Sequence, residues 1–340
     1  MNEQSPVAYN ALIDAFQQAR VLVLGDIMLD RYIWGDVTRI SPEAPVPVVA
    51  KVKETRAAGG AANVALNVVS LGGQAELIGV LGGDASGAEL REILQQSGLS
   101  TDGLVCEAGR RSTVKTRIIA HSQHLVRLDE ESTGNTLPET ESALLERVGA
   151  RLPHCDVVVL SDYAKGVLTN TLVQAVIQLS RAASKPVVVD PKGVHYDRYA
   201  GANVVTPNRS EAAKALGLDG PGSNSTSSLG VRLLAALPVE ALLITEGEAG
   251  MTLFERDNEP VHVSSIARHV YDVSGAGDTV IAAMSLTLSV GGDLLTAATL
   301  GNTAAGVGVE QMGTTAVTSA MLRDALAKRA AALGPDGIPQ

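Results

Sequence analysis

Two acidic residues flank a glycine-rich turn near the end of the chain, in the stretch Asp272-Val273-Ser274-Gly275-Ala276-Gly277-Asp278-Thr279. The apolar run from Val280 to Val290 predicts a helix directly after this turn. Glycines before a helix let the backbone turn tightly and approach a ligand. The unpaired amides of the first helical turn, reinforced by the helix dipole, favour anions. The turn is therefore a candidate site for a phosphate or for an oxyanion that forms in a transition state.

Asp278 lies among these amides, where a carboxylate serves either as an N-terminal helix cap or as a general base. The cap is the simpler interpretation of this residue taken alone. A second carboxylate, Asp272, lies six residues earlier in the same loop and favours a catalytic loop. The choice between the two interpretations depends on residues elsewhere in the chain.

Polar residues also follow several apolar runs of strand length. The first run, Val21 to Leu24, ends in Gly25 and Asp26, and Asp30 follows. The carboxyl ends of parallel strands are where α/β sheets bind ligands, although turn chemistry explains Asp26 equally well. Four later runs, Val157 to Leu160, Val187 to Asp190, Asn203 to Thr206 and Leu242 to Thr245, lead into the polar segments Ser161 to Gly166, Asp190 to Lys192, Pro207 to Glu211 and Thr245 to Gly250.

A second pair of glycines, Gly59 and Gly60, opens another helix of small residues. Asn63, one turn into this helix, can hydrogen-bond a sugar hydroxyl with both its donor and its acceptor. The alternative for Asn63 is a role in helix packing, which is less favoured for an amide flanked by alanines.

The order of the expected strands and helices predicts the fold that holds these polar residues. From residue 156 onward strands and helices alternate, which is typical of a parallel sheet wrapped by helices. Helices are also expected over Tyr9 to Ala19 and Ala85 to Gln96, and a strand over Leu77 to Val80. The sequence therefore predicts the α/β class.

Two segments fall outside this alternation, Arg31 to Glu54 and Ser112 to Arg127. They are rich in β-branched residues and predict short strands, such as Tyr32 to Trp34 and Val46 to Lys51. Two β segments that protrude from an α/β body indicate a lid. A lid with an apolar face often pairs with a second copy of itself, so we expect a homodimer.

Composition excludes several functions. A net charge of −10 argues against a nucleic-acid partner or an acidic membrane surface. Two cysteines without metal-ligand spacing indicate a reducing compartment. The polar N-terminus, Met1 to Asn10, predicts no signal peptide. Polar breaks at Gly291 and Asn302 divide the apolar stretch from Thr279 to Val309, which predicts two buried helices and no membrane span. We therefore expect a cytoplasmic protein.

Several catalytic motifs are absent from the sequence. No Gly-Lys dipeptide occurs, which excludes a P-loop, and no G-x-G-x-x-G follows a strand. The H-E-x-x-H, paired-cysteine and G-x-S-x-G motifs are absent as well, and Ser274 lacks a credible histidine partner. Metalloprotease and serine-hydrolase chemistry are therefore not expected.

Two motifs in order resemble a known family. Gly59-Gly60-Ala61-Ala62-Asn63 and Asp272-x-x-Gly-Ala-Gly-Asp278 are similar to the signatures of the ribokinase/PfkB family of sugar kinases, and the resemblance covers nearly the whole chain. It implies a ribokinase-like, three-layer α/β/α domain over residues 1–340, with a central, mostly parallel sheet and a small β lid formed by about residues 31–56 and 105–129. Ser274 stands where the family usually has threonine, and both residues carry a hydroxyl.

A narrower resemblance is to the D-glycero-β-D-manno-heptose-7-phosphate kinase branch, carried by the stretches Gly25 to Tyr32 and Arg39 to Val48. It implies ATP-dependent phosphorylation of the C1 hydroxyl to give the 1,7-bisphosphate, in ADP-heptose synthesis for the lipopolysaccharide core. Some members carry a fused nucleotidyltransferase, whose H-x-G-H signature is absent here, so a stand-alone kinase is expected. Another sugar, such as fructose or ribose, remains open. So does a non-catalytic sugar- or nucleotide-binding regulator, which the intact Asp278 and Glu211 disfavour.

The resemblance implies roles for the late motif and for the nucleotide site. Asp278 would take the proton of the attacking sugar hydroxyl, and the amides of Gly275, Ala276 and Gly277 would stabilise charge on the transferring phosphoryl group. Asn208 and Glu211 would organise Mg²⁺ and the ATP phosphates, Glu211 through water; the alternative is a helix cap with its capping-box acid. A monovalent cation is a further candidate cofactor. Thr245, Gly247 and Gly250 would line the triphosphate, and Asn302 would border the adenine.

The sugar would be held by Asp30, Gly59, Gly60 and Asn63. Its own phosphate needs cations, and a single exposed cation is more often a solvated surface charge, so two or three must converge. The candidate cations are Lys115, Arg117, Arg127, Lys165 and Lys192. Asp162 is a further candidate contact for the substrate.

Overall fold

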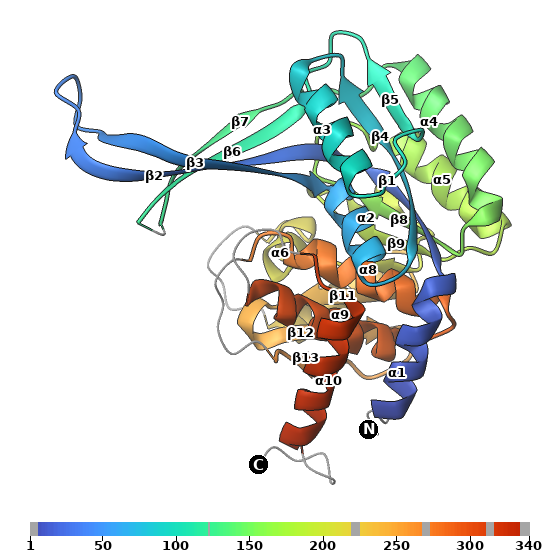
Figure 1. Ribbon diagram of the computed structural model, residues 1–340. Helices are drawn as coiled ribbons and strands as arrows, with labels where there is room; N and C mark the ends of the chain where they lie inside the picture. The colour runs from blue at the N-terminus through green and yellow to red at the C-terminus, as the bar shows by residue number, and fades with distance from the viewer. Residues whose placement is uncertain (1–5, 122, 219–224, 267–272, 311–315, 334–340) are drawn as a thin grey trace.

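A nine-stranded sheet runs through the centre of the protein in the computed structural model (Figure 1). The structure describes residues 6–121, 123–218, 225–266, 273–310 and 316–333. The strand order is β13-β12-β11-β10-β9-β8-β1-β4-β5, parallel from β11 to β5, with β12 antiparallel to both of its neighbours. These strands are β1 (Arg20–Gly25), β4 (Gln74–Gly82), β5 (Leu104–Glu107), β8 (Val157–Ser161), β9 (Val187–Asp190), β10 (Val204–Val205), β11 (Ala241–Thr245), β12 (Gly250–Glu255) and β13 (Val261–Ser264).

The apolar runs form this sheet because both of its faces are buried. In β1, Val21 and Val23 belong to one core, whereas Leu22 and Leu24 belong to the other, and all four side chains are fully buried. Alternate residues therefore serve opposite cores, so a continuous apolar run is required. The predicted α/β class with a mostly parallel sheet is confirmed.

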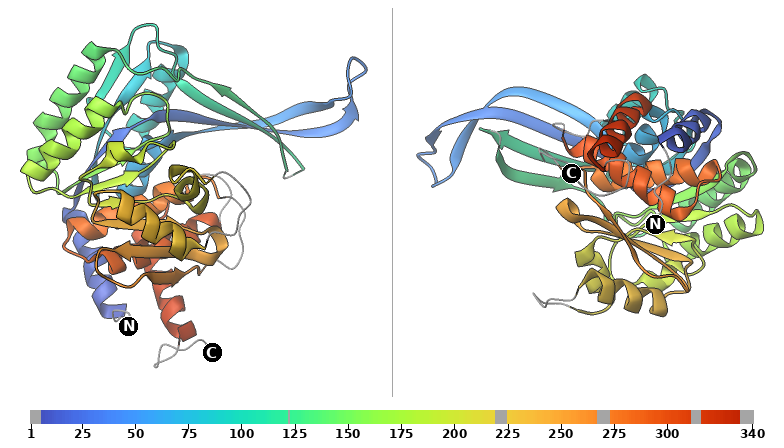
Figure 2. Two further views of the ribbon diagram at one scale, coloured as in Figure 1. Left: turned by 180° about the vertical axis from the view of Figure 1, so that it is seen from behind. Right: turned by 90° about the horizontal axis from the view of Figure 1, so that it is seen from below.

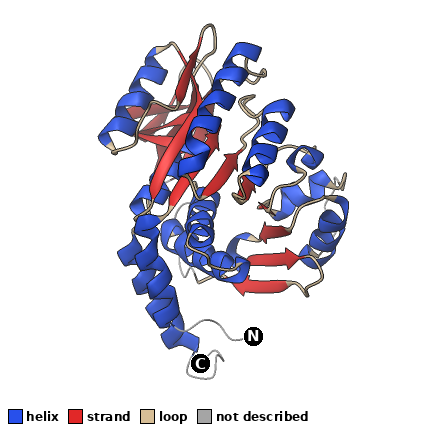
Figure 3. Ribbon diagram, turned by 90° about the vertical axis from the view of Figure 1, so that its right-hand side faces the viewer, coloured by secondary structure: helices blue, strands red, loops and turns tan. Residues whose placement is uncertain are grey.

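Helices cover both faces of the sheet (Figure 3). One face packs against α1 (Pro6–Ala15), α2 (Ala61–Ser70), α3 (Ala85–Gln96), α8 (Ala276–Ser289), α9 (Leu294–Val309) and α10 (Ser319–Leu333). The other packs against α4 (Pro138–Arg151), α5 (Asn170–Ala182), α6 (Arg209–Ala215) and α7 (Thr226–Ala236). Short 3-10 turns lie at Phe16–Gln18, Leu152–His154, Tyr196–Tyr199 and Gly247–Ala249. None of the described helices is long and apolar enough to cross a membrane.

A separate four-stranded sheet, the lid, projects from this body (Figures 1 and 2). Its order is β3-β2-β6-β7, with β2 parallel to β6 and the other pairs antiparallel. Its strands are β2 (Ile27–Ile40), β3 (Pro47–Gly60), β6 (Thr113–Ala120) and β7 (Gln123–Glu130).

The lid differs from the sequence prediction in three respects. The short strands expected at Tyr32 to Trp34 and Val46 to Lys51 are parts of two 14-residue strands, β2 and β3, which pair along most of their length. Because β2 starts at Ile27, Asp30 lies inside a lid strand and not in a loop after β1. Residues 104–107, assigned in part to the lid, form β5 and pair with β4 of the main sheet.

Gly25 lies where β1 passes closest to β8. A Cβ atom at this position would be 2.1 Å from the carbonyl oxygen of Ser161 and 3.1 Å from Cβ of Ala61. At 2.1 Å the added Cβ would overlap the Ser161 carbonyl oxygen. This oxygen belongs to the backbone of β8, which could not shift without moving the strand. The end of β1, which leads into the lid, therefore requires glycine for space.

We expect Gly25→Ala to lower the free energy of unfolding by about 1–3 kcal/mol, because an added methyl would displace the β8 backbone. The matched control is Gly149→Ala in α4, where nothing lies within 4 Å of the added Cβ. That change should raise the stability by about 0.5–1 kcal/mol through helix propensity. Urea denaturation measures both, and equal effects of the two substitutions would contradict the close approach.

Candidate active site

The predicted glycine-rich turn forms the start of α8. Gly275 adopts a left-handed conformation with φ of 79°, and Thr279 donates its amide to the Gly275 carbonyl at 3.0 Å. Gly277 is exposed, and nothing lies within 4 Å of where its Cβ would be. Ala276 donates its amide to the carbonyl of Val273 at 3.2 Å, so this one of the three predicted amides is engaged within the turn. Asp272 lies outside the described residues.

Asp278 is buried, with 3% of its surface exposed. Its Oδ1 accepts a hydrogen bond from the Tyr163 hydroxyl at 2.8 Å, and its Oδ2 accepts one from Nδ2 of Asn63 at 2.7 Å. The N-cap position of α8 belongs to Gly275, with no side-chain cap. The carboxylate is therefore held between two other elements, and these bonds favour the general-base interpretation over the cap.

The environment of Asp278 tunes its acidity. Burial raises the pKa of this carboxyl from 3.8 to about 6, against the hydrogen bonds from Asn63 and Tyr163, which lower it; nearby Asp30 adds to the rise. A base works best when its pKa is close to the working pH. At neutral pH this carboxylate is mostly ionised and still basic enough to take a proton.

A polar chain links Asp278 to the crossing of α2 and α8. Asn67 donates Nδ2 to the Asn63 carbonyl at 2.9 Å and to Oδ1 of Asn63 at 3.3 Å, and the Thr279 hydroxyl donates to Oδ1 of Asn67 at 3.2 Å. The Asn63 amide, predicted to face the sugar, is thus directed at Asp278 and Asn67. Its contact with a sugar stays a prediction.

Asp26 fastens the loop that carries Tyr163. This buried carboxylate, at the end of β1, accepts backbone amides from Tyr163 at 2.8 Å, Lys165 at 3.1 Å and Val167 at 3.2 Å. Ala164 between them has a positive φ of 55°, which a non-glycine residue adopts only when its surroundings require it. Asp26 therefore orients this loop. A residue that only formed a local turn would not accept three amides from a distant segment.

Asp162 anchors the same loop from its other end. Its Oδ1 accepts the amide of Ala164 at 2.8 Å, and its Oδ2 accepts the Tyr199 hydroxyl at 2.8 Å and lies 3.4 Å from Nη1 of Arg198. The side chain is 3% exposed. Both oxygens are engaged by protein groups, which gives Asp162 a structural role in this loop. Its predicted contact with the substrate stays a prediction.

Asp30 lies on the lid side of Asp278, within reach of its charge. Arg117 of the neighbouring strand β6 forms an ion pair with Asp30, so this candidate phosphate ligand already has an acidic partner. A Cβ on Gly59 would lie 2.2 Å from Oδ2 of Asp30, and Gly60, with φ of 61°, turns the chain into α2. The two glycines therefore make room for the carboxylate and for the turn beside it.

One predicted cation lies beside Tyr163, and two others act on its charge. Lys115 lies over the Tyr163 ring, with Nζ 5.9 Å from its centroid. Burial lowers the pKa of Lys115, and the charges of Lys165 and Arg127 act in the same direction. Lys165 forms an ion pair with Glu131 at 2.6 Å, whereas Lys115 forms none among the described residues. Arg127 is more exposed and pairs with Asp129.

A pocket of about 210 Å³ lies between the strand ends and the start of α8. Asn208 and Glu211 line it and form the capping box of α6: Oδ1 of Asn208 accepts the Glu211 amide at 2.9 Å, and Oε2 of Glu211 accepts the Asn208 amide at 3.0 Å. Lys192 pairs with Oε1 of Glu211 at 2.6 Å. The pocket is lined by Asp162, Tyr163, Asp190, Pro191, Lys192, Thr206, Asn208, Glu211, Thr245, Gly277 and Val280.

Two acids in this pocket suit a magnesium ion. Asp190, which the sequence analysis noted only as a strand end, faces the pocket with Glu211, and burial, together with the charges of Asp278 and Glu211, raises the pKa of Asp190 well above its usual range. Mg²⁺ binds one or two carboxylates and completes its shell with water and phosphate oxygens. Within the described residues no group of three or more His, Cys, Asp or Glu side chains could hold a metal. The donor set therefore fits Mg²⁺ shared with a nucleotide.

Of the other residues predicted to contact the nucleotide, some line the pocket and others pack within the protein. Thr245 lines the pocket, and Gly247, with φ of 62°, opens the turn after β11. Gly250 is required by close packing, because its Cβ would lie 2.2 Å from the carbonyl oxygen of Val263. Asn302 is buried and donates Nδ2 to the Ser264 carbonyl at 2.7 Å, which ties α9 to β13. Contacts of these residues with a nucleotide stay predictions.

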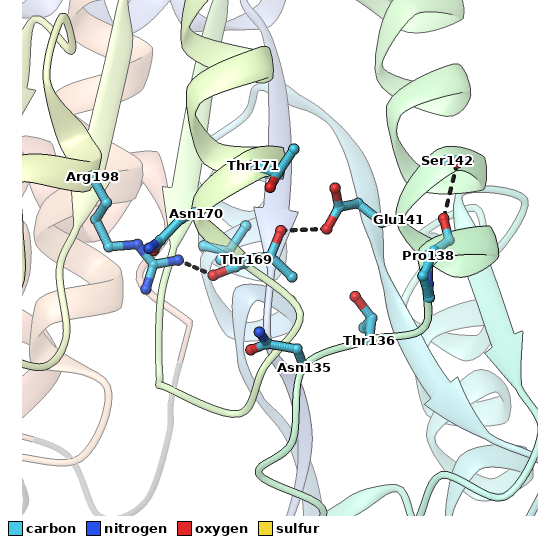
Figure 4. Close-up of a pocket in the computed structure, with 10 residues that line it drawn as sticks. Asn135, Thr136, Pro138, Glu141, Ser142, Thr169, Asn170, Thr171 and Arg198 are labelled. Carbon is cyan, nitrogen blue, oxygen red and sulfur yellow. Dashed lines mark hydrogen bonds between the residues drawn. The ribbon is translucent and has the colours of Figure 1, made fainter.

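A larger pocket of about 640 Å³ lies between the starts of α4 and α5 (Figure 4). Some of its polar groups bond one another or the backbone: the Thr169 hydroxyl donates to Glu141, and Arg198 donates to the Leu168 carbonyl. No predicted site residue lines it. The smaller pocket, which meets the start of α8, is the better candidate for the reaction.

Comparisons with known proteins agree with this geometry. The model of the pfkB family carbohydrate kinases matches residues 18–321. The bifunctional protein HldE of Caulobacter sp. (strain K31) is 49% identical over 306 residues, covering 90% of this chain and 62% of that protein. The chain thus spans less than two thirds of the length of this curated relative.

Two solved structures have the same fold. A putative ribokinase from Agrobacterium tumefaciens has a TM-score of 0.75 and 22% identity, covering 91% of this chain and 98% of that chain. Arabidopsis thaliana ribokinase complexed with ribose and ATP has a TM-score of 0.71 and 20% identity, with the same coverage.

We expect Asp278→Asn to stabilise the folded protein at about pH 8 and to lose this advantage in acid. The raised pKa of about 6 means that the folded protein holds the proton more tightly than the unfolded chain. The stability that the folded protein gains from holding this proton is fully present below about pH 4 and is lost as the pH rises through about 6. Asparagine buries no charge, so the free energy of unfolding should rise by about 1–2 kcal/mol at about pH 8 and change little at about pH 4. Urea denaturation at both pH values measures this, with Asp102→Asn at an exposed turn as control. A gain that does not depend on pH would contradict the raised pKa.

Proposed function

The chain belongs to the pfkB family of carbohydrate kinases and is an ATP-dependent sugar kinase, and we propose that its sugar is D-glycero-β-D-manno-heptose 7-phosphate. The product would be the 1,7-bisphosphate, formed with ADP, for ADP-heptose synthesis in lipopolysaccharide core assembly. Because ATP is the donor, we place the enzyme in the cytoplasm. The proposal concerns the kinase region alone.

The observation that carries this proposal is the cation beside Tyr163. Lys115 lies over the ring of Tyr163, whose hydroxyl bonds Asp278, and the charges of Lys165 and Arg127 act on Lys115. Lys165 and Arg127 have acidic partners, whereas Lys115 forms no ion pair among the described residues. A phosphate at the far end of the sugar would supply the anion that Lys115 lacks, and an unphosphorylated sugar would not. The resemblance to the heptose-phosphate branch supports the same substrate.

The proposed chemistry follows from the position of Asp278. Its carboxylate takes the proton of the C1 hydroxyl as that oxygen forms a bond to the γ-phosphorus, and the bond from this phosphorus to the β,γ-bridging oxygen breaks to release ADP. The start of α8 stabilises negative charge on the transferring group. Phosphoryl transfer depends mainly on such positioning and charge neutralisation.

We assign the pocket at the strand ends to the ATP phosphates. Asn208, Glu211 and Asp190 would hold Mg²⁺ there, largely through water, and Thr245 would line the triphosphate. When bound, Mg²⁺ neutralises charge on the β- and γ-phosphates. On the sugar side, Asp30 would accept hydroxyl hydrogens beside Gly59. A monovalent cation remains part of the proposal.

A coupled assay of ADP release over heptose 7-phosphate, unphosphorylated heptose, fructose and ribose tests the substrate. We expect the highest kcat/KM for heptose 7-phosphate. Lys115→Met, which keeps an apolar stem, should raise the KM for this sugar by about 10–100-fold, because a charged hydrogen bond to phosphate is lost. It should leave the KM for ATP nearly unchanged.

Lys192→Met, at the nucleotide pocket, is the matched control and should affect ATP more than the sugar. A preference for fructose or ribose would replace the proposed substrate. The absence of any sugar-dependent ADP release would overturn the proposed reaction as a whole.

We further propose that the lid pairs with the lid of a second copy. Val126 and Leu128 are 54% and 57% exposed on β7, an edge strand of the lid, on the face opposite Arg127. Val52 on β3, the other edge strand, is 71% exposed. Exposed apolar side chains on both edge strands of a projecting sheet offer a surface that a partner could cover.

We expect a dimer by light scattering at about micromolar concentration, since apolar lid surface must leave water. The double substitution Val126→Asp and Leu128→Asp should shift the protein to monomer. Val231→Asp on α7, at a valine that is 55% exposed but far from the lid, should leave the dimer intact. A wild-type monomer would refute the pairing.

A further inference from the structure

Tyr163 is not among the site residues predicted from the sequence, yet its hydroxyl lies 2.8 Å from Oδ1 of Asp278. No motif pointed to this residue, because it follows a strand in an ordinary polar turn. Its position next to the base depends on β8 and α8 meeting at one edge of the sheet. The contact joins segments 115 residues apart in sequence.

The backbone of the loop that carries Tyr163 is held in place by several contacts. Asp26 accepts the Tyr163 amide, and the following Ala164 is held at positive φ. Gly166 has φ of 87°, and a Cβ there would lie 2.1 Å from the carbonyl oxygen of Gly134. Strain of this kind persists only where the surroundings impose it. The loop backbone therefore fixes the Tyr163 hydroxyl in its position beside Asp278.

We propose that Tyr163 is a positioning residue for the general base: its hydroxyl orients the Asp278 carboxylate and stabilises its ionised form. This inference rests on the proposed role of Asp278 as the base. Asn63 holds Oδ2 from α2 while Tyr163 holds Oδ1 from the opposite loop. Two donors on different oxygens resist rotation of the carboxylate, and each oxygen keeps a lone pair for the sugar hydroxyl.

The charges that face Asp278 explain why a second donor matters. Asp30 on β2 disfavours a further negative charge on Asp278, and the charge of Asp278 in turn raises the pKa of Asp190 at the end of β9. Burial acts in the same direction, whereas the hydrogen bonds from Tyr163 and Asn63 oppose it. Without the phenol, the carboxyl would hold its proton to higher pH and would be a poorer acceptor at neutral pH.

The test is the pH dependence of kcat in Tyr163→Phe, which keeps the ring and removes only the hydroxyl. We expect the acidic limb of the profile to move upward by about one pH unit. At about pH 6, kcat should fall by up to about tenfold, while the KM for ATP should stay nearly constant. The matched control is Tyr199→Phe, which removes an equivalent 2.8 Å bond from tyrosine to a buried aspartate, Asp162. It should change thermal stability and leave the acidic limb in place.

An unchanged acidic limb in folded Tyr163→Phe protein would overturn the inference, even if the melting temperature fell. If the wild type phosphorylates no sugar, the proposed function fails, but the contact can still be tested. The infrared band of the protonated carboxyl that disappears in Asp278→Asn should titrate at higher pH in Tyr163→Phe. If Tyr163→Phe does not fold, the wild-type sequence can be made with 3-fluorotyrosine, whose hydroxyl is a stronger hydrogen-bond donor. Asp278 should then titrate at lower pH, and an unchanged titration would overturn the proposal.

Discussion

The candidate active site is built around one buried carboxylate, which the proposed reaction requires in its ionised form. Asp278 loses its hydration at the start of α8, and burial alone would make it a weak acid that holds its proton at neutral pH. The Asn63 amide and the Tyr163 hydroxyl offset part of that cost from two sides. The balance leaves a base whose pKa, about 6, is close to the pH at which it would work.

Holding both donors in place explains much of the surrounding architecture. Asn63 is fixed by Asn67 at the crossing of α2 and α8, and Tyr163 is fixed by Asp26 at the end of β1. A single residue, Asp26, separates β1 from the first lid strand. The same carboxylate therefore lies at the start of the lid and at the base of the Tyr163 loop, so these two parts of the structure share one support.

The sequence predicted the parts of this site that local patterns encode. Runs such as Val21 to Leu24 indicate strands because both faces are buried, and Asn208 with Glu211 indicates a helix start because the capping box is local. The partners of these residues could not be predicted, since pairings such as Tyr163 with Asp278 depend on the order of strands in the sheet. The ion pair of Asp30 with Arg117 was missed for the same reason, because β2 and β6 are distant in sequence and parallel in space.

The central claim is that Asp278 removes a proton during phosphoryl transfer. The most direct measurement is the turnover number of Asp278→Asn, made beside binding of ATP and sugar to the same folded protein. Asparagine has nearly the same shape but cannot accept the proton, so binding should persist while turnover falls by about 10²–10⁴-fold. Turnover within a few-fold of wild type would contradict the claim and leave Asp278 with a structural role at the start of α8.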